Sequence, residues 1–225
     1  MVITIDGPAG AGKSTAARRL ASALGIAFLD TGATYRAVTL RAMRAGDDLS
    51  DAGKLAEHAR RMDLELIPRS GGLGVILDGR DVSEEIRTET VSRNAHHAAG
   101  SPEVRGVLVE LQRRIGRDLG NFVTEGRDQG TVVFPDADVK FYLDASPSER
   151  ARRRSDELTL RGEPASPQTV LQAILARDES DAARSVGPLR PADNAIHMDT
   201  TGNSIEDTLA ELLQHVRTRT GWEAV

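Results

Sequence analysis

The pattern of hydrophobic and polar positions predicts short strands that alternate with helices. A β-branched run at 2–5 leads into a glycine-rich segment, and small and apolar residues then recur at helical spacing over 13–24 until Gly25. The apolar run at 27–29 predicts a second buried strand, which ends at Asp30-Thr31-Gly32. This alternation predicts an α/β fold in which a parallel sheet carries helices on both faces.

Residues 64–86 follow a different pattern. Strand-like runs there are separated by Gly71-Gly72 and by Asp78-Gly79, and both pairs are typical of hairpin turns. We therefore expect a small antiparallel sheet, inserted at about 64–98 into a core made of 1–63 and 99–225.

Serine followed by proline marks three expected helix starts. Ser101, Ser146 and Ser166 each place a capping hydroxyl before a proline at the first helical position. Glu149 stands three residues after Ser146, which predicts a complete capping box there. Further strands are expected at 121–125, 138–144 and 195–199, and a last helix from Ser204.

Composition narrows the class of protein. The sequence of 225 residues has 39% hydrophobic and 28% charged residues, without an apolar run long enough to span a membrane. Cysteine is absent, which excludes disulfides, thiolate metal sites and a cysteine nucleophile. The first residues pass directly into a strand-like run without the basic flank of a signal peptide, so we expect a cytoplasmic protein.

The charge argues against a polymeric nucleic acid as partner. The formal net charge is −5 and aromatic residues make up 3% of the chain, so both a basic stripe and a stacking platform are missing. The lysines are Lys13, Lys54 and Lys140, and every other permanent cation is an arginine, whose forked donors suit phosphate oxygens.

A phosphate-binding loop follows the first strand. The segment GPAGAGKS at 7–14 matches G-x-x-x-x-G-K-[ST] at every fixed position. Its glycines allow backbone N–H groups to turn inward, and the helix that follows adds its positive N-terminal end. We expect Lys13 to reach the outer phosphates of a nucleoside triphosphate and the Ser14 hydroxyl to bind Mg²⁺.

Three further features favour a kinase for a small phosphorylated acceptor. DTGATYR at 30–36 and EGRD at 125–128 each follow a predicted parallel strand, at the edge where ligands bind. Arg150, Arg153, Arg154, Arg161, Arg177 and Arg184 form an arginine series. A guanine-reading Asn-Lys-x-Asp segment is absent, which argues against a GTPase.

These blocks make the sequence similar to the bacterial cytidylate kinase family over nearly its whole length. The resemblance rests on VITIDGPAGAGKST at the start, LDTGATYRA at 29–37, VILDGRDVSEEIRT at 75–88, EGRDQGTVVFPDADVKFYLDAS at 125–146 and the RD…R…PL pattern at 177–189. It implies a P-loop fold with three α/β/α layers, a nucleoside-monophosphate subdomain at 64–98 and a short helical lid at about 150–165. It also implies transfer of the γ-phosphoryl group of ATP to CMP or dCMP by a monomer.

The resemblance assigns roles residue by residue. ATP would be bound by Gly7, Pro8, Ala9, Gly10, Ala11, Gly12, Lys13, Ser14 and Thr15. CMP would be bound by Thr31, Arg36, His96, Arg105, Arg127, Asp128, Arg177, Asp181 and Arg184. Within that set, Arg36 and Arg127 would hold the phosphate, Arg105 and Asp128 would face the cytosine, and the others at 177–184 would lie around the ribose and phosphates. The catalytic residues would be Lys13, Arg127, Asp128, Arg153, Arg177 and Arg184.

Some positions allow two interpretations. Thr31 stands where the family often has serine, which preserves the hydroxyl. His96 could donate to the base, but paired histidines such as His96-His97 are more often surface residues, and we favour that interpretation. Glu125 could support Mg²⁺ through water or be an ordinary strand-end acid. The arginine face of the helix at 146 could serve the lid or be a solvated surface. For Arg152 we expect a solvated surface, and for Arg153 and Arg154 a function in the lid.

Three other functions compete with a CMP kinase. A P-loop kinase for another small metabolite is the nearest, and the 64–98 segment with GRDQGTVVFP argues against it. A nucleotide-binding regulator without activity would need a degraded site, whereas Lys13, Ser14, Arg36, Arg127 and Asp128 are all present. A nucleic-acid-binding module is disfavoured by the charge and the few aromatic residues.

Overall fold

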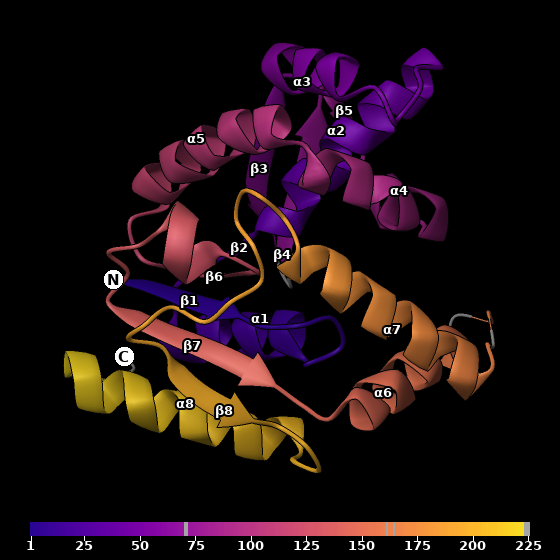
Figure 1. Cartoon of the computed structure of the whole chain (residues 1–225). Coiled ribbons are helices and arrows are strands. Elements are labelled where there is room, and N and C mark those ends of the chain that lie inside the picture. Colours follow the sequence, from indigo (N-terminus) through magenta and orange to yellow (C-terminus); the bar gives the residue numbers. More distant parts are fainter. Residues whose placement is uncertain (70–71, 161, 164, 223–225) are drawn as a thin grey trace. The chain divides into compact units, whose positions relative to one another are not determined.

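The computed structural model describes residues 1–69, 72–160, 162–163 and 165–222 and divides the chain into two units. Unit 1 comprises Met1–Ile26 with Val123–Val225, and unit 2 comprises Ala27–Phe122. A parallel five-stranded sheet has the strand order β2-β6-β1-β7-β8, and an antiparallel sheet has the order β3-β4-β5 (Figure 1). The predicted α/β class, with a parallel sheet flanked by helices and a small antiparallel sheet, is confirmed.

Unit 1 contains the glycine-rich loop and most of the parallel sheet. Its elements are β1 (Val2–Asp6), α1 (Lys13–Leu24), β6 (Phe122–Gly126, whose first residue belongs to unit 2), the π-helix η2 (Gln129–Val133), β7 (Val139–Asp144), α6 (Pro147–Leu160), α7 (Pro167–Ala182), β8 (Ile196–Asp199) and α8 (Ile205–Thr220). Strand β1 runs parallel to β7, and β7 runs parallel to β8.

The two faces of β1 and β7 differ in polarity. Ile5 and Phe141 are register partners and are buried, and the Phe141 ring meets the edge of His215 of α8 at 6.2 Å between ring centroids. Helices α1 and α8 contact each other. On the other face of β1, Thr4 and Asp6 are buried polar side chains. The polar face is therefore the one available for chemistry at the carboxyl end of β1.

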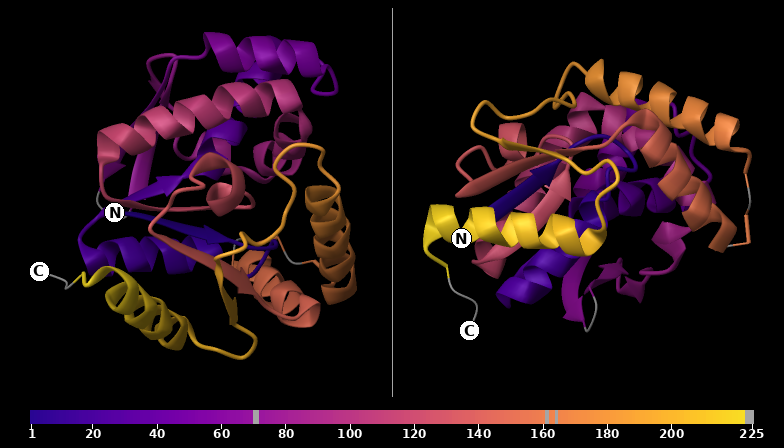
Figure 2. Two further views of the ribbon diagram at one scale, coloured as in Figure 1. Left: turned by 60° about the vertical axis from the view of Figure 1, so that its left-hand side comes forward. Right: turned by 90° about the horizontal axis from the view of Figure 1, so that it is seen from below.

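Helices α6 and α7 lie side by side, as both views in Figure 2 show. Ala151, Val170 and Ile174 form their buried contact, and Ser166 caps α7 by accepting from Thr169 N at 3.1 Å. The three Ser-Pro helix starts are confirmed.

The complete capping box predicted at Ser146 is wrong. Ser146 Oγ accepts from Glu149 N at 3.3 Å, but Ser146 N donates to Thr201 Oγ1 at 2.8 Å. The Glu149 carboxylate instead binds Arg152 and Arg153. Reciprocal bonds are made at Ser204 and Asp207, where α8 begins.

Unit 2 combines the antiparallel sheet with four α-helices among its described residues. Its elements are β2 (Ala27–Asp30), α2 (Thr31–Ala45), α3 (Ala52–Arg61), β3 (Leu64–Arg69), β4 (Gly72–Leu77), β5 (Arg80–Asp81), the 3₁₀ helix η1 (Glu85–Arg87), α4 (Glu89–Gly100) and α5 (Pro102–Leu119). The Asp78-Gly79 turn is confirmed, with positive φ at both residues (49° and 75°). The other predicted turn falls partly on Gly71, outside the described residues.

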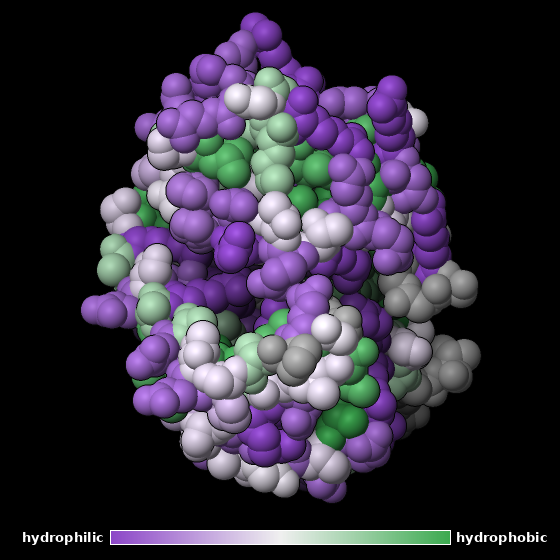
Figure 3. Space-filling view, turned by 90° about the vertical axis from the view of Figure 1, so that its right-hand side faces the viewer, coloured by the Kyte–Doolittle hydropathy of each residue, from purple (hydrophilic) through white to green (hydrophobic). Residues whose placement is uncertain are grey.

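Hydrophilic residues predominate on the face drawn in Figure 3. Within the described part of the chain, none of the helices combines the length and the apolar character that a membrane span requires.

Candidate active site

The loop between β1 and α1 has the backbone of an anion cradle. Gly10 and Gly12 adopt left-handed φ values of 79° and 83°, which side-chain-bearing residues rarely do. Gly7 has φ 146°, and a Cβ there would lie 1.9 Å from the carbonyl oxygen of Leu143. The glycines at the fixed motif positions are therefore required by the path of the loop.

Lys13 is the cation of this cradle. Its side chain is buried, and Nζ donates to the Pro8 carbonyl oxygen at 2.6 Å. Burial and, to a lesser extent, the nearby charge of Arg127 lower the pKa of Lys13 to about 7, against a smaller opposing effect of Glu125. The position thus holds an ammonium at high electrostatic cost, which an anionic ligand would relieve.

Ser14 and Glu125 form the oxygen pair at the cradle. Ser14 Oγ donates to Glu125 Oε1 at 2.9 Å, and Glu125 is buried near the end of β6. Hydroxyl and carboxylate oxygens suit Mg²⁺, which usually keeps several waters and takes further oxygens from phosphates. No group of three ligating side chains occurs among the residues described. The pair therefore fits a phosphate-borne Mg²⁺ better than a site built by protein ligands alone.

Helices α6 and α7 fix the apex of the loop. Both backbone groups of Ala9 are bonded: its N–H donates to Asp178 Oδ1 at 3.1 Å, and its carbonyl accepts from Arg150 Nη1 at 3.0 Å. Arg150 and Asp178 also form an ion pair, and Arg150 Nε donates to Ala145 O at 2.9 Å. Arg150 is consequently buried and bonded within the protein, rather than displayed on an arginine face.

Arg153 lies against the loop. Its Nη1 is 3.6 Å from where a Cβ on Gly12 would stand. Nε donates to Glu149 at 2.9 Å, and Nη1 and Nη2 donate to Thr200 Oγ1 and O at 3.1 and 2.6 Å. Arg152, by contrast, is exposed and pairs with Glu149 and Asp156, which confirms the solvated surface expected for it.

A second arginine group is centred on Asp181 of α7. The buried carboxylate accepts from Arg127 Nε at 2.8 Å and pairs with Arg184. Burial raises the pKa of Asp181, but the charges of the neighbouring arginines outweigh burial and hold it below its usual value. Arg177 lies one turn earlier on α7 and is exposed. The group carries more positive than negative charge, as an anion site requires.

Asp128 is buried between the end of β6 and the start of η2. Directly after it, the N–H groups of Gln129 and Gly130 donate to Asp6 Oδ1 and Oδ2 at 2.9 and 2.7 Å. Burial raises the pKa of Asp6 to about 6, although both backbone bonds act to lower it.

In unit 2, α2 begins directly at Thr31, within the Asp30-Thr31-Gly32 segment at which the second strand was expected to end. The Asp30 side chain caps the helix by accepting from Ala33 N at 3.1 Å. Gly32 is thus helical, and a Cβ there would lie 2.8 Å from Arg36 Nη1. The absence of a side chain at Gly32 therefore makes room for the Arg36 guanidinium.

The same Asp30 carboxylate holds two arginines. Arg36 Nη2 donates to Oδ2 at 2.9 Å, and Arg87 of η1 lies 3.5 Å from the same oxygen. Asp30 is buried, whereas the side chains of Arg36 and Arg87 are 21% and 41% exposed. Both guanidinium groups are therefore held in place and still accessible.

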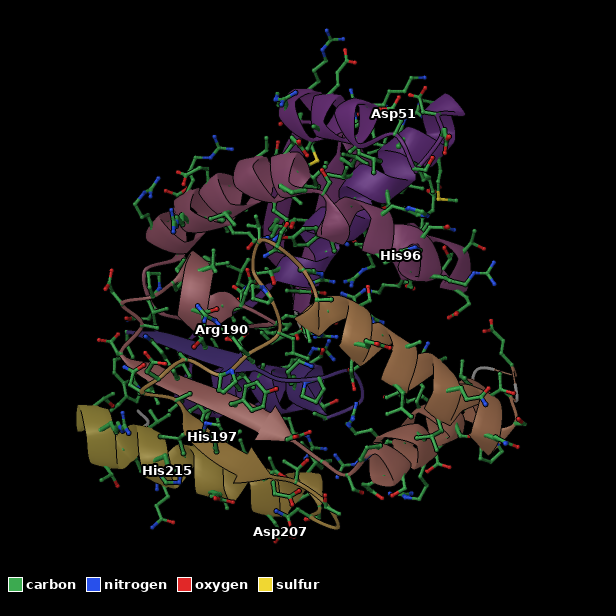
Figure 4. The ribbon with its side chains drawn as sticks, in the orientation of Figure 1. Asp51, His96, Arg190, His197, Asp207 and His215 are labelled. Atoms are coloured by element: carbon green, nitrogen blue, oxygen red, sulfur yellow. The ribbon has the colours of Figure 1, made fainter. Side chains whose placement is uncertain are left out.

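Arg105 and His96 have contrasting environments. Arg105 is buried, with its guanidinium 5.7 Å from the Tyr35 ring centroid, a cation–π distance. His96 lies exposed on α4 (Figure 4), and its Nδ1 is 2.7 Å from Arg93 O. The surface location favoured for His96 is confirmed.

The predicted site residues divide between the two units. Unit 1 contains the loop with Thr15, and also Glu125, Arg127, Asp128, Arg153, Arg177, Asp181 and Arg184. Unit 2 contains Thr31, Arg36, His96 and Arg105.

Sequence reasoning assigned no role to Asp6, Arg87, Asp178 or Thr200. Three of them carried a local signal, since Asp6 and Arg87 lie in quoted blocks and Asp178 follows Arg177 directly. Thr200 was revealed only by its contacts with Arg153, which is distant in sequence.

Known proteins resemble this chain along nearly its full length. Residues 3–218 match the model of the family described as cytidylate kinase. A cytidylate kinase of Carboxydothermus hydrogenoformans is 48% identical over 214 residues, which cover 95% of this chain and 96% of that protein. The chain belongs to the cytidylate kinase family. Another cytidylate kinase, from Actinobacillus succinogenes, is 42% identical and covers 98% of this chain and 100% of its own length.

A solved structure supports the fold alone. An uncharacterized protein from Eubacterium ventriosum superposes with a TM-score of 0.54 at 12% identity, covering 97% of this chain and 99% of that one.

Proposed function

We propose that this member of the cytidylate kinase family transfers the γ-phosphoryl group of ATP to CMP or dCMP, giving ADP and CDP or dCDP. The observation that carries the proposal is the phosphate cradle with buried Lys13, joined in unit 1 by the arginine group on Asp181. The cradle fits the donor phosphates, and the second cationic group fits a phosphorylated acceptor.

The chemistry requires positioning and charge neutralisation more than a base. An oxygen of the acceptor phosphate attacks the γ-phosphorus in line, a new P–O bond forms, and the bond from that phosphorus to the β–γ bridging oxygen breaks. The acceptor oxygen is already anionic, so no strong general base is needed. Lys13, Arg153, Arg177 and Arg184 would offset the charge of two polyanions brought together.

Mg²⁺ would be held through Ser14, with Glu125 acting through water. The Ser14–Glu125 pair at 2.9 Å supports this assignment. When bound, the ion supplies neutralisation of the charge between the outer phosphates of the donor.

Base selection is assigned to Asp128 and Arg105. A carboxylate can accept from the exocyclic amino group of cytosine, and an arginine can donate to the ring carbonyl and N3. Uracil presents a carbonyl to the same carboxylate, so we expect it to be disfavoured. We assign the CMP phosphate to Arg36 and Arg127, and Thr31 and Asp181 complete the proposed acceptor set. His96 is left out of this set, because its exposed position on α4 favours a surface role.

We further assign the acceptor to the insert at 64–98 and closure over ATP to the segment at about 150–165. Arg161, one of the arginine series in that segment, lies outside the described residues. A cytoplasmic location and a monomeric state stay predictions.

A coupled spectrophotometric assay with CMP, dCMP, UMP, AMP and GMP tests the proposal. We expect turnover of CMP and dCMP, slower turnover of UMP, and loss of activity when EDTA removes divalent cations. Faster turnover of UMP than of CMP would contradict the base assignment. Nucleotide binding without turnover of any acceptor would support a regulator instead.

A further inference from the structure

Asp6 links the phosphate cradle to the segment assigned to the base. It is the last residue of β1, immediately before Gly7, and is buried. Its two carboxylate oxygens accept from two consecutive N–H groups, Gln129 at 2.9 Å and Gly130 at 2.7 Å. One side chain on the polar face of β1 thus fixes the first residues of η2.

Two residues, Arg127 and Asp128, connect the end of β6 at Gly126 to the start of η2 at Gln129. Both are assigned to CMP binding. The Asp128 carbonyl accepts from Val132 N at 2.9 Å, inside the helix that Asp6 holds. Asp128 itself has φ −144° and ψ 23°, outside the regular helix and strand regions. Its direction therefore depends on where the start of η2 is fixed.

Close packing leaves little freedom at this junction. A Cβ on Gly130 would lie 2.8 Å from Thr4 Oγ1, 3.2 Å from Lys140 Cδ and 3.4 Å from Asp6 Oδ2. On the other side, Thr124 Oγ1 donates to Gln129 Oε1 at 3.2 Å. The start of η2 thus lies directly against β1, and a side chain at 130 would push the two apart.

We propose that Asp6 is a positioning residue for acceptor specificity: by binding the N–H groups of Gln129 and Gly130, it orients Asp128 toward the cytosine. The proposal rests on the function proposed above for Asp128. Asp6 itself contacts η2, and its effect on the base is transmitted through the backbone of Asp128.

Two substitutions disrupt the contact between Asp6 and η2, one on each side of it. Asp6→Asn keeps one acceptor oxygen and turns an amide donor toward a backbone N–H, so one bond is lost and two donors face each other. Gly130→Ala retains the carboxylate but inserts a methyl group between η2 and β1. Agreement between two different chemical changes would identify the contact, rather than either side chain, as the cause.

Each substitution has a matched control. Asp138 Oδ2 accepts from the backbone N–H of Val2 at 2.7 Å, at the other end of β1, so Asp138→Asn makes the same chemical change away from η2. A Cβ on Gly100 would meet nothing within 4 Å, which makes Gly100→Ala the control for the added methyl group.

The measurement is the ratio of kcat/KM for CMP to that for UMP, with KM for CMP and ATP determined separately. In Asp6→Asn and Gly130→Ala we expect the ratio to fall and KM for CMP to rise, each about 10-fold, as for loss of one charge-assisted hydrogen bond. KM for ATP should change less than about twofold in these variants. Both control variants should match wild type, because they keep the bonds from Asp6 to Gln129 and Gly130.

Equal increases in both KM values would overturn the proposal, because Asp6 would then act on the adjoining loop. An unchanged ratio in both folded variants would also overturn it. If Asp6→Asn does not fold by circular dichroism, Gly130→Ala decides alone. A wild-type chain that does not phosphorylate CMP would reject the proposed function itself, whereas a CMP-selective wild type with an unchanged ratio in the variants rejects only the role of Asp6.

Discussion

In each unit a buried carboxylate binds two arginines, but the two carboxylates differ in their structural roles. The arginines are Arg127 and Arg184 for Asp181, and Arg36 and Arg87 for Asp30. Asp181 lies within α7, where its side chain pairs with guanidinium groups. Asp30 also caps α2 through Ala33 N. Asp181 therefore only positions guanidinium groups, whereas Asp30 both positions guanidinium groups and stabilises the start of a helix.

Lys13 is the cation whose loss should slow the reaction most. We expect Lys13→Ala to lower kcat about 1000-fold, because a positioned charge at the donor phosphates is removed. The fold should survive, since the ammonium is buried and its charge is disfavoured there. Kinetics and thermal melting check this. Lys54→Ala, which removes a lysine paired with Asp47 on the surface, is the control, and near-normal turnover of Lys13→Ala would reject the assigned role.

Asp181→Asn tests a carboxylate that organises charge alone. It should lower kcat/KM for CMP about 30-fold, because neutralising Asp181 releases Arg127 and Arg184 from their shared partner. The melting temperature should fall less than for Asp30→Ala, because no helix cap is lost. Steady-state kinetics measure kcat/KM, and calorimetry measures the melting temperature. A large loss of stability with unchanged kinetics would make Asp181 structural and remove the contrast.

Phosphate binding in unit 1 should depend on pH through Lys13. Because the pKa of Lys13 is lowered to about 7, its positive charge is present below that pH and is lost above it. Affinity for inorganic triphosphate should therefore weaken about fivefold between pH 7 and 8. Calorimetric titration measures it, and Lys13→Arg, which stays charged, should show a flatter profile. Parallel profiles for the two proteins would show that another group titrates.

Two substitutions at Asp30 distinguish its role as the cap of α2 from its role as the negative charge that holds Arg36 and Arg87. Asp30→Ala should destabilise the fold by about 1 kcal/mol more than Asp30→Asn, because asparagine still caps α2. Both variants lose the negative charge between Arg36 and Arg87, so KM for CMP should rise equally in both. Urea unfolding and kinetics make the comparison. Equal stability of the two variants would show that the Ala33 bond contributes nothing.

Sequence patterns correctly predicted those structural features that depend on residues close to one another in the sequence. Helix α1 begins at Lys13 and ends before Gly25 as expected, because glycines and apolar spacing act locally. The Asp78-Gly79 turn follows from the same local chemistry. Family resemblance supplied Asp181 together with Arg127 and Arg184, but it assigned no role to Asp30, which holds Arg36 and Arg87.

Long-range partners account for what the sequence did not reveal. Asp6 and Gly130 are 124 positions apart, and no periodicity links them. The box at Ser146 failed for the same reason, since Thr201 takes the N–H that Glu149 was expected to bind. Such competition between a near and a distant partner is decided by packing.

Strand β8 has a consequence for the behaviour of the chain at high concentration. It stands last in the strand order of the parallel sheet, and therefore forms one of its edges. The strand is only four residues long, and its His197 and Asp199 side chains are exposed; His197 is labelled in Figure 4. A short, polar edge offers a poor template for a strand from another molecule. At this edge, strand length and polarity together protect the sheet against intermolecular pairing and aggregation.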